Sequence, residues 1–180
     1  MNHPPLHCVR PNYIEASSQA WKLAQQHSAG KIGYVLVIEE DDEWHSRDLA
    51  ACLLFKNYAP GRERMVPPLI LRPADYLPLG PWLSQHNPDL IVTNNPGTHW
   101  ALVELKIRVP DEVQIIGLNI YERDFMSGFR LLNQEMGVAA MHILDSLVRL
   151  GERGIPVYRQ THLMELLWNP GTTLRTTARK

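Results

Sequence analysis

Short apolar runs alternate with longer amphipathic stretches along the chain. The runs with the length and continuity of strands buried on both faces of a parallel sheet are 32–38, 66–71, 90–93 and 113–118. Apolar residues recur at helical spacing in 12–27, 44–58 and 98–107. The proline-broken stretch 74–86 makes a poor helix. Strands alternating with helices predict an α/β fold, a parallel sheet with helices on both faces.

The pattern changes after Asn119. Residues 120–128 have no clean period, and the most amphipathic helix of the chain is predicted at Glu135–Leu150. Its apolar stripe consists of Met136, Ala140, Ile143, Leu144 and Leu147. Two short strand-like segments, 157–162 and 164–168, precede a polar tail.

The composition is that of an ordinary globular protein and excludes several classes. Of the 180 residues, 44% are hydrophobic and 21% charged, and a net charge of −1 offers no basic surface for nucleic acid. No apolar run approaches the roughly 18 residues that span a bilayer, and the first residues lack the pattern of a signal peptide, so we expect a cytoplasmic protein without membrane contact. Cys8 and Cys52 lie far apart in apolar stretches and are expected to be buried free thiols.

Catalytic and metal chemistry has little support in the sequence. None of the eight histidines stands at a metal-ligand spacing, and hydrolase elbows, phosphate loops and dinucleotide-binding turns are absent. The acidic run 39–43 is interpreted as a solvated loop before a helix. We therefore expect neither an enzyme nor a metal site, and no cofactor.

Polar residues stand where three of the predicted strands end. Trp44-His45-Ser46-Arg47 follow the first strand, Asn94-Asn95 the third and Asn119 the fourth. Ligands of open parallel sheets bind beyond the carboxyl ends of the strands, so these residues are candidates for one site. Amides donate and accept, arginine grips adjacent oxygens, and indole stacks on the apolar side of a sugar. The alternatives are that the asparagines only cap a helix and that Arg47 is solvated.

In order and spacing, these stretches resemble the lactose-repressor (LacI) family of transcription regulators. Residues 88–95 (PDLIVTNN) are similar to the family's third strand, which ends in an Ala-Asn-Asp-like triplet. Residues 102–119 (LVELKIRVPDEVQIIGLN) are similar to its helix, its Arg-Val-Pro-x-Asp-like turn and the strand that follows. Ser46-Arg47-x-x-Ala50 falls where the family has Ser-x-x-Arg-x-x-Gly-Phe, and residues 135–140 resemble the returning helix. The resemblance covers roughly residues 5–175.

The resemblance implies a two-lobed, periplasmic-binding-protein-like effector domain without its DNA-binding headpiece and most of its N-terminal lobe. It divides the chain into 1–10, a remnant of the N-terminal lobe, and 11–119, the C-terminal lobe. Residues 120–156 become a crossover and a helix returning towards the N-terminal lobe, and 157–180 the final strands of the C-terminal lobe and the tail. The chain is then a fragment of a longer regulator or the product of a truncated gene.

The same resemblance assigns roles to residues. Effector contacts fall on Arg47, Asn94 and Asn119, with Asn95 and Trp44 beside them, and the effector is a small sugar-like molecule. DNA is bound only through a headpiece outside this chain. A homodimer is implied, because a helix-turn-helix reads two half-sites with two-fold symmetry. The expected dimer interface is His99, Leu102, Val103, Lys106, Phe125 and Met126.

Three questions about these roles stay open. Leu118-Asn119-Ile120 replaces a Phe-Asp-Asp-like triplet and Asn94-Asn95 the commoner Asn-Asp, so a carboxylate that accepts ligand hydroxyls is missing and the effector is not identified. Phe125 and Met126 could fold back onto their own core instead of facing a partner. The stripe of the helix Glu135–Leu150 needs cover from a partner, an exchanged segment or the strand Leu6–Arg10.

Two other classes of protein would account for part of the sequence. Residues 35–43 resemble the strand and acidic cluster that hold magnesium in a phosphoacceptor receiver domain, and 88–94 resemble the strand that ends in its phosphorylated aspartate. Position 94 is asparagine, however, and a receiver leaves 1–30 and 125–175 without a role. A small enzyme acting on sugars or nucleotides is the third possibility.

Overall fold

The computed structural model of the protein describes residues 6–38 and 45–176, with the side chains of 45–49 left out. Its helices are α1 (Tyr13–His27), α2 (His45–Tyr58), α3 (Leu79–His86), α4 (Gly97–Glu104) and α5 (Asn133–Arg149), with a 3-10 turn η1 (Arg62–Arg64). Its strands are β1 (Cys8–Pro11), β2 (Ile32–Val37), β3 (Leu69–Leu71), β4 (Leu90–Thr93), β5 (Gln114–Gly117), β6 (Gly128–Arg130), β7 (Thr161–Met164) and β8 (Leu167–Asn169).

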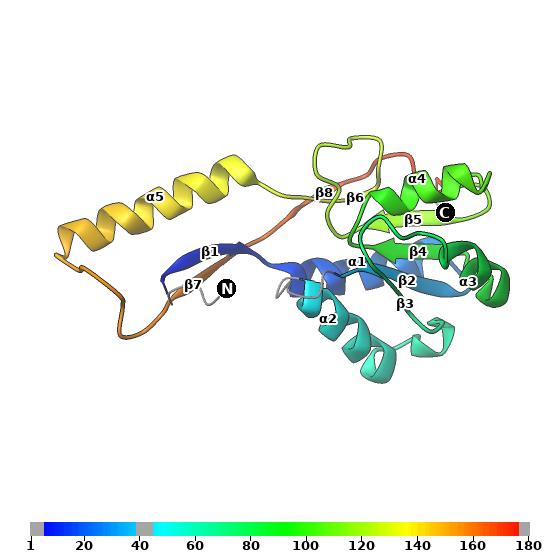
Figure 1. The fold of residues 1–180 in the computed structure, drawn as a ribbon, viewed down its shortest axis with the longest axis horizontal. Helices are drawn as coiled ribbons and strands as arrows, with labels where there is room; N and C mark the ends of the chain where they lie inside the picture. Colours follow the sequence, from blue (N-terminus) through cyan, green and yellow to red (C-terminus); the bar gives the residue numbers. More distant parts are fainter. Residues whose placement is uncertain (1–5, 39–44, 177–180) are drawn as a thin grey trace.

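Six strands form the sheet of what we call the main lobe, which also contains α1 to α4 (Figure 1). The strand order is β3-β2-β4-β5-β6-β8, and every neighbouring pair is parallel except β6 and β8. The predicted α/β fold with a parallel sheet is therefore confirmed. The chain runs from β2 outwards to β3 and then returns to place β4 on the other side of β2, which makes the space between β2 and β4 a topological switch point.

Alternate residues of the central strands supply two separate hydrophobic cores. In β2, Ile32, Tyr34 and Leu36 pack against α1 and α2 on one face. Val35 and Val37 pack against α3 and α4 on the other. All six residues of β2 are buried, which explains why its sequence is a continuous apolar run rather than an alternating one.

The remaining elements, β1, α5 and β7, form what we call the small lobe. β1 and β7 make a parallel two-stranded sheet in which Cys8 pairs with Thr161 and Pro11 with Met164. α5 lies against β1, and the three elements extend together from one end of the main lobe (Figure 1). None of the 17 residues of α5 is buried.

The structure corrects several expected boundaries. β7 pairs with β1 in the small lobe, so only β8 of the segment 157–180 joins the main sheet. Residues 128–130, expected within the crossover, form β6 and extend the main sheet. β3 begins at Leu69 rather than Val66, because prolines 67 and 68 cannot donate to a sheet ladder.

The α1 helix begins at Tyr13, one residue after the start of the predicted helical stretch 12–27. The side chain of Asn12 accepts a hydrogen bond from the backbone nitrogen of Glu15 at 3.3 Å, which satisfies one of the free amides of the first turn.

Among the helices that the structure describes, none is long and apolar enough to cross a membrane.

Candidate functional site

The carboxyl ends of β2, β4 and β5 lie side by side at one edge of the main sheet. Thr93 at the end of β4 pairs with Val35 of β2 and with Gly117 of β5. Asn94 and Asn95 leave this edge from β4, and Asn119 leaves it two residues after β5. The structure therefore brings the three asparagines to the same edge of the sheet.

Asn94 lies in the switch point between β2 and β4. Its Oδ1 accepts a hydrogen bond from the backbone nitrogen of Val37 at 2.9 Å, and its Nδ2 donates to the backbone oxygen of Val37 at 3.0 Å. Only 4% of the residue is exposed. The amide thus joins the ends of two neighbouring strands, and one N–H and one lone pair remain for any further partner.

Asn95 and Asn119 also shape their own backbone turns. Oδ1 of Asn95 accepts hydrogen bonds from the backbone nitrogen of Gly97 at 2.7 Å and from the hydroxyl of Tyr76 at 3.2 Å, at the start of α4. Oδ1 of Asn119 accepts from the backbone nitrogen of Tyr121 at 3.0 Å, and its amide nitrogen bonds to no residue that the structure describes. The helix-capping interpretation therefore describes Asn95, whereas Asn119 keeps its donor.

The side chains of the other two predicted contacts, Arg47 and Trp44, are outside the described part of the structure. Arg47 lies in the first turn of α2, the helix that follows the carboxyl end of β2, and its side chain is outside the described part of the structure. Trp44 and the acidic run 39–43 lie outside the described residues altogether. The effector roles of Arg47, Asn94, Asn95, Asn119 and Trp44 remain predictions.

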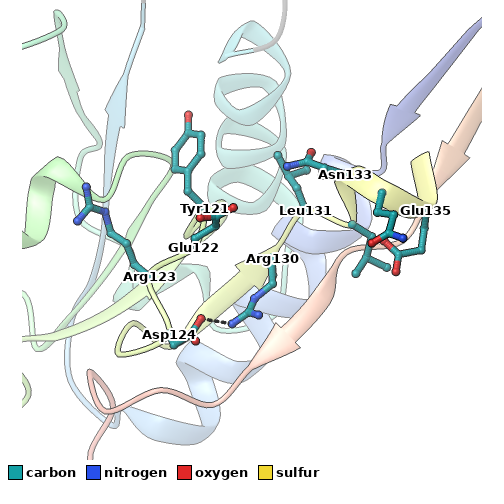
Figure 2. A pocket seen from close by; sticks show the side chains of 10 residues that line it. Tyr121, Glu122, Arg123, Asp124, Arg130, Leu131, Asn133 and Glu135 are labelled. Carbon is teal, nitrogen blue, oxygen red and sulfur yellow. Dashed lines mark hydrogen bonds and ion pairs between the residues drawn. The ribbon is translucent and has the colours of Figure 1, made fainter. Parts of the chain in front are cut away.

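A hollow of about 1040 Å³ opens beside this edge, between the loop from β5 to β6 and the link from β6 to α5. Figure 2 shows Tyr121, Glu122, Arg123 and Asp124 on the loop, Arg130 on β6, and Asn133 and Glu135 at the start of α5. The four loop residues belong to the stretch 120–128, in which the sequence has no clean period. A concentration of charged residues, Glu122-Arg123-Asp124, was the signal that could have found the hollow.

Charges of both signs line the hollow. The guanidinium of Arg130 forms an ion pair with Asp124 (Figure 2). The Nε atom of Arg130 is buried and has no hydrogen-bond partner among the described residues. A buried donor without a partner costs free energy, so the Nε atom is an unsatisfied polar group at the wall of the hollow.

The surface of α4 holds most of the residues expected at a dimer interface. His99 and Phe125 are half-buried, with ring centroids 5.0 Å apart, and Val103 and Lys106 are exposed. Trp100 was not among the predicted interface residues, but it is 48% exposed. Its ring centroid lies 6.3 Å from that of Phe125, and the guanidinium of Arg123 lies over its ring. These side chains form an accessible aromatic surface.

Leu102 and Met126 are corrections to that expected interface. Both are fully buried in the core between the main sheet and α3–α4, so they present no surface to a partner. For Met126 the alternative, folding back onto the chain's own core, is what the structure contains. Burial of the pair follows from their positions on the side of α4 and of the β5–β6 loop that faces the sheet.

Two further observations bear on the other classes of protein. No group of three or more His, Cys, Asp or Glu side chains that could hold a metal ion occurs in the described part of the chain. The strand order of β3, β2, β4, β5 and β6 is also that of receiver domains. A receiver domain, however, needs a carboxylate at the end of its third strand, and Asn94 uses its amide to join β4 to β2.

The sequence matches no described family profile and no curated protein. Similar solved structures include a LacI family transcriptional regulator from Enterococcus faecium with bound ribose, at 13% identity, a TM-score of 0.68, and coverage of 97% of this chain and 69% of that one. A periplasmic binding protein/LacI transcriptional regulator from Alkaliphilus metalliredigens, complexed with D-xylulofuranose, matches at 15% identity, a TM-score of 0.72 and the same coverage of both chains.

A third similar structure is a LacI family transcriptional regulator from Arthrobacter sp. FB24 in complex with lactose. It is 16% identical, with a TM-score of 0.69 and coverage of 93% of this chain and 65% of that one. The protein therefore has the periplasmic-binding-protein-like fold of LacI-type regulators, and it spans 65–69% of the length of these three chains.

Proposed function

We propose that this chain is the ligand-sensing part of a transcription regulator and that it binds a small sugar-like effector at the carboxyl edge of the main sheet. The observation that carries the proposal is the hollow with charged lining residues beside the switch-point edge. Arg130 lines this hollow, and the amide nitrogen of Asn119, in the turn before the β5–β6 loop, has no partner among the described residues. The similar structures with bound ribose, D-xylulofuranose or lactose support a polyhydroxy ligand.

The proposed contacts divide the recognition of such a ligand. Arg47 and Arg130 grip adjacent hydroxyl oxygens through their guanidinium groups, and Asn119 with the remaining N–H of Asn94 donates to others. Trp44 stacks on the apolar side of the sugar ring, and Asn95 positions the turn before α4. None of these steps is chemical, so the proposed role is binding rather than catalysis.

Calorimetric titration of the chain with ribose, D-xylulose and lactose tests the proposal. We expect weak binding, with a Kd of about 1 mM (about −4 kcal/mol), because only part of a two-lobed cleft is built from this chain. Arg130→Gln should weaken it about tenfold. Arg108→Gln is the matched control, because Arg108 lies before β5, at the opposite edge of the sheet, in an exposed pair with Glu112. The site would be contradicted if Arg130→Gln left the Kd unchanged. It would also be contradicted if Arg108→Gln raised the Kd as much as Arg130→Gln does.

We further infer that the chain forms a homodimer through the α4 surface, His99, Trp100, Val103, Lys106 and Phe125, so that an attached helix-turn-helix reads two half-sites. Aromatic and large apolar side chains are enriched at such interfaces. Light scattering should give a smaller mass for Val103→Glu than for the wild type. The chain itself should not bind DNA at physiological salt, because its net charge is −1.

A further inference from the structure

A second hollow, with a volume of about 470 Å³, lies between α1 and the last two turns of α2. It shares no lining residue with the hollow at Arg130. Its volume is within the range of about 300–1,000 Å³ that small-molecule sites occupy in proteins. Like such sites, it combines apolar and aromatic walls with a small number of polar groups. We call it the α1–α2 pocket.

The wall that α1 contributes is a single face of that helix. Its residues are Ser18, Trp21, Lys22 and Gln25. Their spacing of three, four and seven residues from the first member places all four side chains on the same side of a helix. This wall therefore presents one large aromatic ring and three polar side chains to the pocket.

The wall that α2 contributes is apolar and aromatic. Leu54 and Tyr58 are 54% and 77% exposed, and Phe55 is half-buried. The ring of Phe55 is nearly parallel to that of Trp21, with an interplanar angle of 8° and a centroid distance of 6.4 Å. Both helices thus line the pocket with aromatic rings, which favours a ligand that itself carries a flat ring.

The aromatic part of the pocket is fixed before any ligand binds. Nε1 of Trp21 donates to the backbone oxygen of Pro60 at 3.2 Å, and Nε2 of Gln25 donates to the same oxygen at 3.0 Å. The indole also stacks on Tyr34, whose ring centroid lies 6.5 Å away. Only 3% of Trp21 is exposed, so little side-chain freedom remains to be lost on binding.

The polar groups of the pocket keep unused hydrogen-bonding capacity. Lys22 is the only charged residue in the described lining, is exposed, and makes no hydrogen bond or ion pair with a described residue. The hydroxyl of Ser18 is also without a partner among the described residues. Because the one charge of the lining is positive and no carboxylate stands beside it, the complementary ligand is an anion.

We propose that the α1–α2 pocket binds a small aromatic carboxylate. Its ring lies against Trp21 and Phe55, where binding removes apolar surface from water. Its carboxylate accepts hydrogen bonds from the ammonium of Lys22 and the hydroxyl of Ser18. This chemistry differs from that of an uncharged polyhydroxy sugar, so failure of sugar binding leaves the pocket standing, and failure at the pocket leaves the sugar site standing.

An NMR titration with 2-naphthoate, followed at the indole N–H signals, tests the proposal. The signal of Trp21 should shift saturably, with a Kd of about 1 mM or below for a ligand of this size. The signal of Trp82 is an internal control and should not move, because Trp82 lies in the other core and donates to Pro67 at 2.9 Å.

The charge part of the proposal is tested with 2-naphthamide, which keeps the ring and lacks the negative charge. It should bind the wild type about threefold more weakly than 2-naphthoate, because an ion pair at an exposed lysine contributes little. In Lys22→Gln the acid and the amide should bind with equal Kd values. A structural role of Lys22 would change both Kd values together and leave their ratio unaltered.

Two neighbouring leucines of α2 provide a matched pair of variants. Leu53 and Leu54 are 45% and 54% exposed, but only Leu54 lines the pocket. Leu54→Asp places a carboxylate inside it and should weaken binding of 2-naphthoate at least tenfold, roughly, through charge repulsion and lost apolar contact. Leu53→Asp should leave the Kd unchanged. Circular dichroism shows whether α2 stays folded in each variant.

Several outcomes would overturn the proposal. They are a Trp21 signal that does not move at about 5 mM 2-naphthoate, equal shifts of Trp21 and Trp82, equal weakening in the two leucine variants, and an amide that binds the wild type as tightly as the acid. A Trp21 signal that moves with chain concentration in the absence of 2-naphthoate would show that a second copy covers the pocket, and it would overturn the proposal as well.

Discussion

The main lobe and the small lobe both contain apolar side chains, but they differ in how much of this apolar surface they bury. In the main lobe every residue of β2, β4 and β5 is buried, between helices on both faces. In the small lobe, α5 has no buried residue, and β1 and β7 make a two-stranded sheet with no further strand beside them among the described residues. A sheet needs layers on its faces and several strands to be stable alone. The apolar pattern of a sequence thus predicts which faces of a helix or strand are buried, but it does not predict which element buries them.

One cysteine lies in each lobe, Cys52 in the main lobe and Cys8 in the small lobe. We expect the largest measurable difference between the lobes in the reactivity of these two thiols. Burial raises the pKa of Cys52 to about 12, against 9.0 for a free thiol, so about a thousandfold less thiolate exists at neutral pH. Burial acts in the same direction on Cys8, but hydrogen bonds from Thr161 and Arg159, with the charges of Arg10 and Arg159, lower its pKa overall. We expect iodoacetamide at pH 7.5 to modify Cys8 at least a hundredfold faster than Cys52, as measured by mass spectrometry of the peptides. Comparable rates would mean that the main lobe opens as readily as the small one.

Truncation of equivalent apolar side chains in the two lobes should have unequal effects. Leu36→Ala should lower the free energy of unfolding of the main lobe by about 2–5 kcal/mol, because Leu36 is fully buried. Leu147→Ala, at a half-buried position of α5, should lower it by less than about 1 kcal/mol. Urea unfolding followed by tryptophan fluorescence gives both values, because Trp21, Trp82, Trp100 and Trp168 lie in the main lobe. Equal losses would show that the two lobes unfold as one unit.

The lobes also differed in how well the sequence predicted them. Positions whose environment is set locally were predicted closely: the strand 90–93 was placed to the residue, and the helix predicted at 12–27 is α1, which begins at Tyr13. β6 was missed, because its three residues have no period and become a strand only by pairing with Gly117 and with β8. β7 was assigned to the wrong lobe, because only the long-range pairing with β1 decides which sheet a short strand joins.

The sequence predicted the edge of the sheet that three of the candidate residues share, but not the contacts that each of them makes. The switch-point edge follows from the order of strands and helices, and it brought Asn94, Asn95 and Asn119 together. The sequence left open whether each amide serves a ligand or the backbone, since that depends on atoms such as those of Val37 and Tyr121. The hollow at Arg130 was missed, because it arises where a loop and a crossover from different parts of the fold meet.

The contribution of two site asparagines, Asn94 and Asn119, to the stability of the main lobe can be measured by substitution. Asn94→Ala should reduce stability by about 1–3 kcal/mol, because it leaves the backbone nitrogen and oxygen of Val37 buried without partners. Asn119→Ala, which removes one hydrogen bond to the backbone of Tyr121, should cost about 0.5–1.5 kcal/mol. Chemical denaturation measures both. A smaller loss for Asn94→Ala than for Asn119→Ala would mean that β2 and β4 hold together without the amide.

The smallest effect that we expect is a pH dependence at the α4 surface. Burial, and then the nearby charge of Arg123, lower the pKa of His99 below its ordinary value of 6.5. The unfolded chain therefore binds a proton at His99 at a higher pH than the folded chain does, so stability is lost as pH falls below about 6.5 and the loss levels off below the folded pKa. The loss should be only about a few tenths of a kcal/mol, because the half-exposed site is screened by solvent.

His99→Gln should abolish this part of the pH dependence. The difference in unfolding midpoint between the two proteins, followed from pH 7.5 to pH 5, isolates it from the other histidines, which both proteins share. Contact with a second copy at α4 would bury His99 further and widen the difference at high chain concentration. A His99 that titrates above 6.5 in the folded chain, measured by NMR, would contradict the direction of the shift and the burial that causes it.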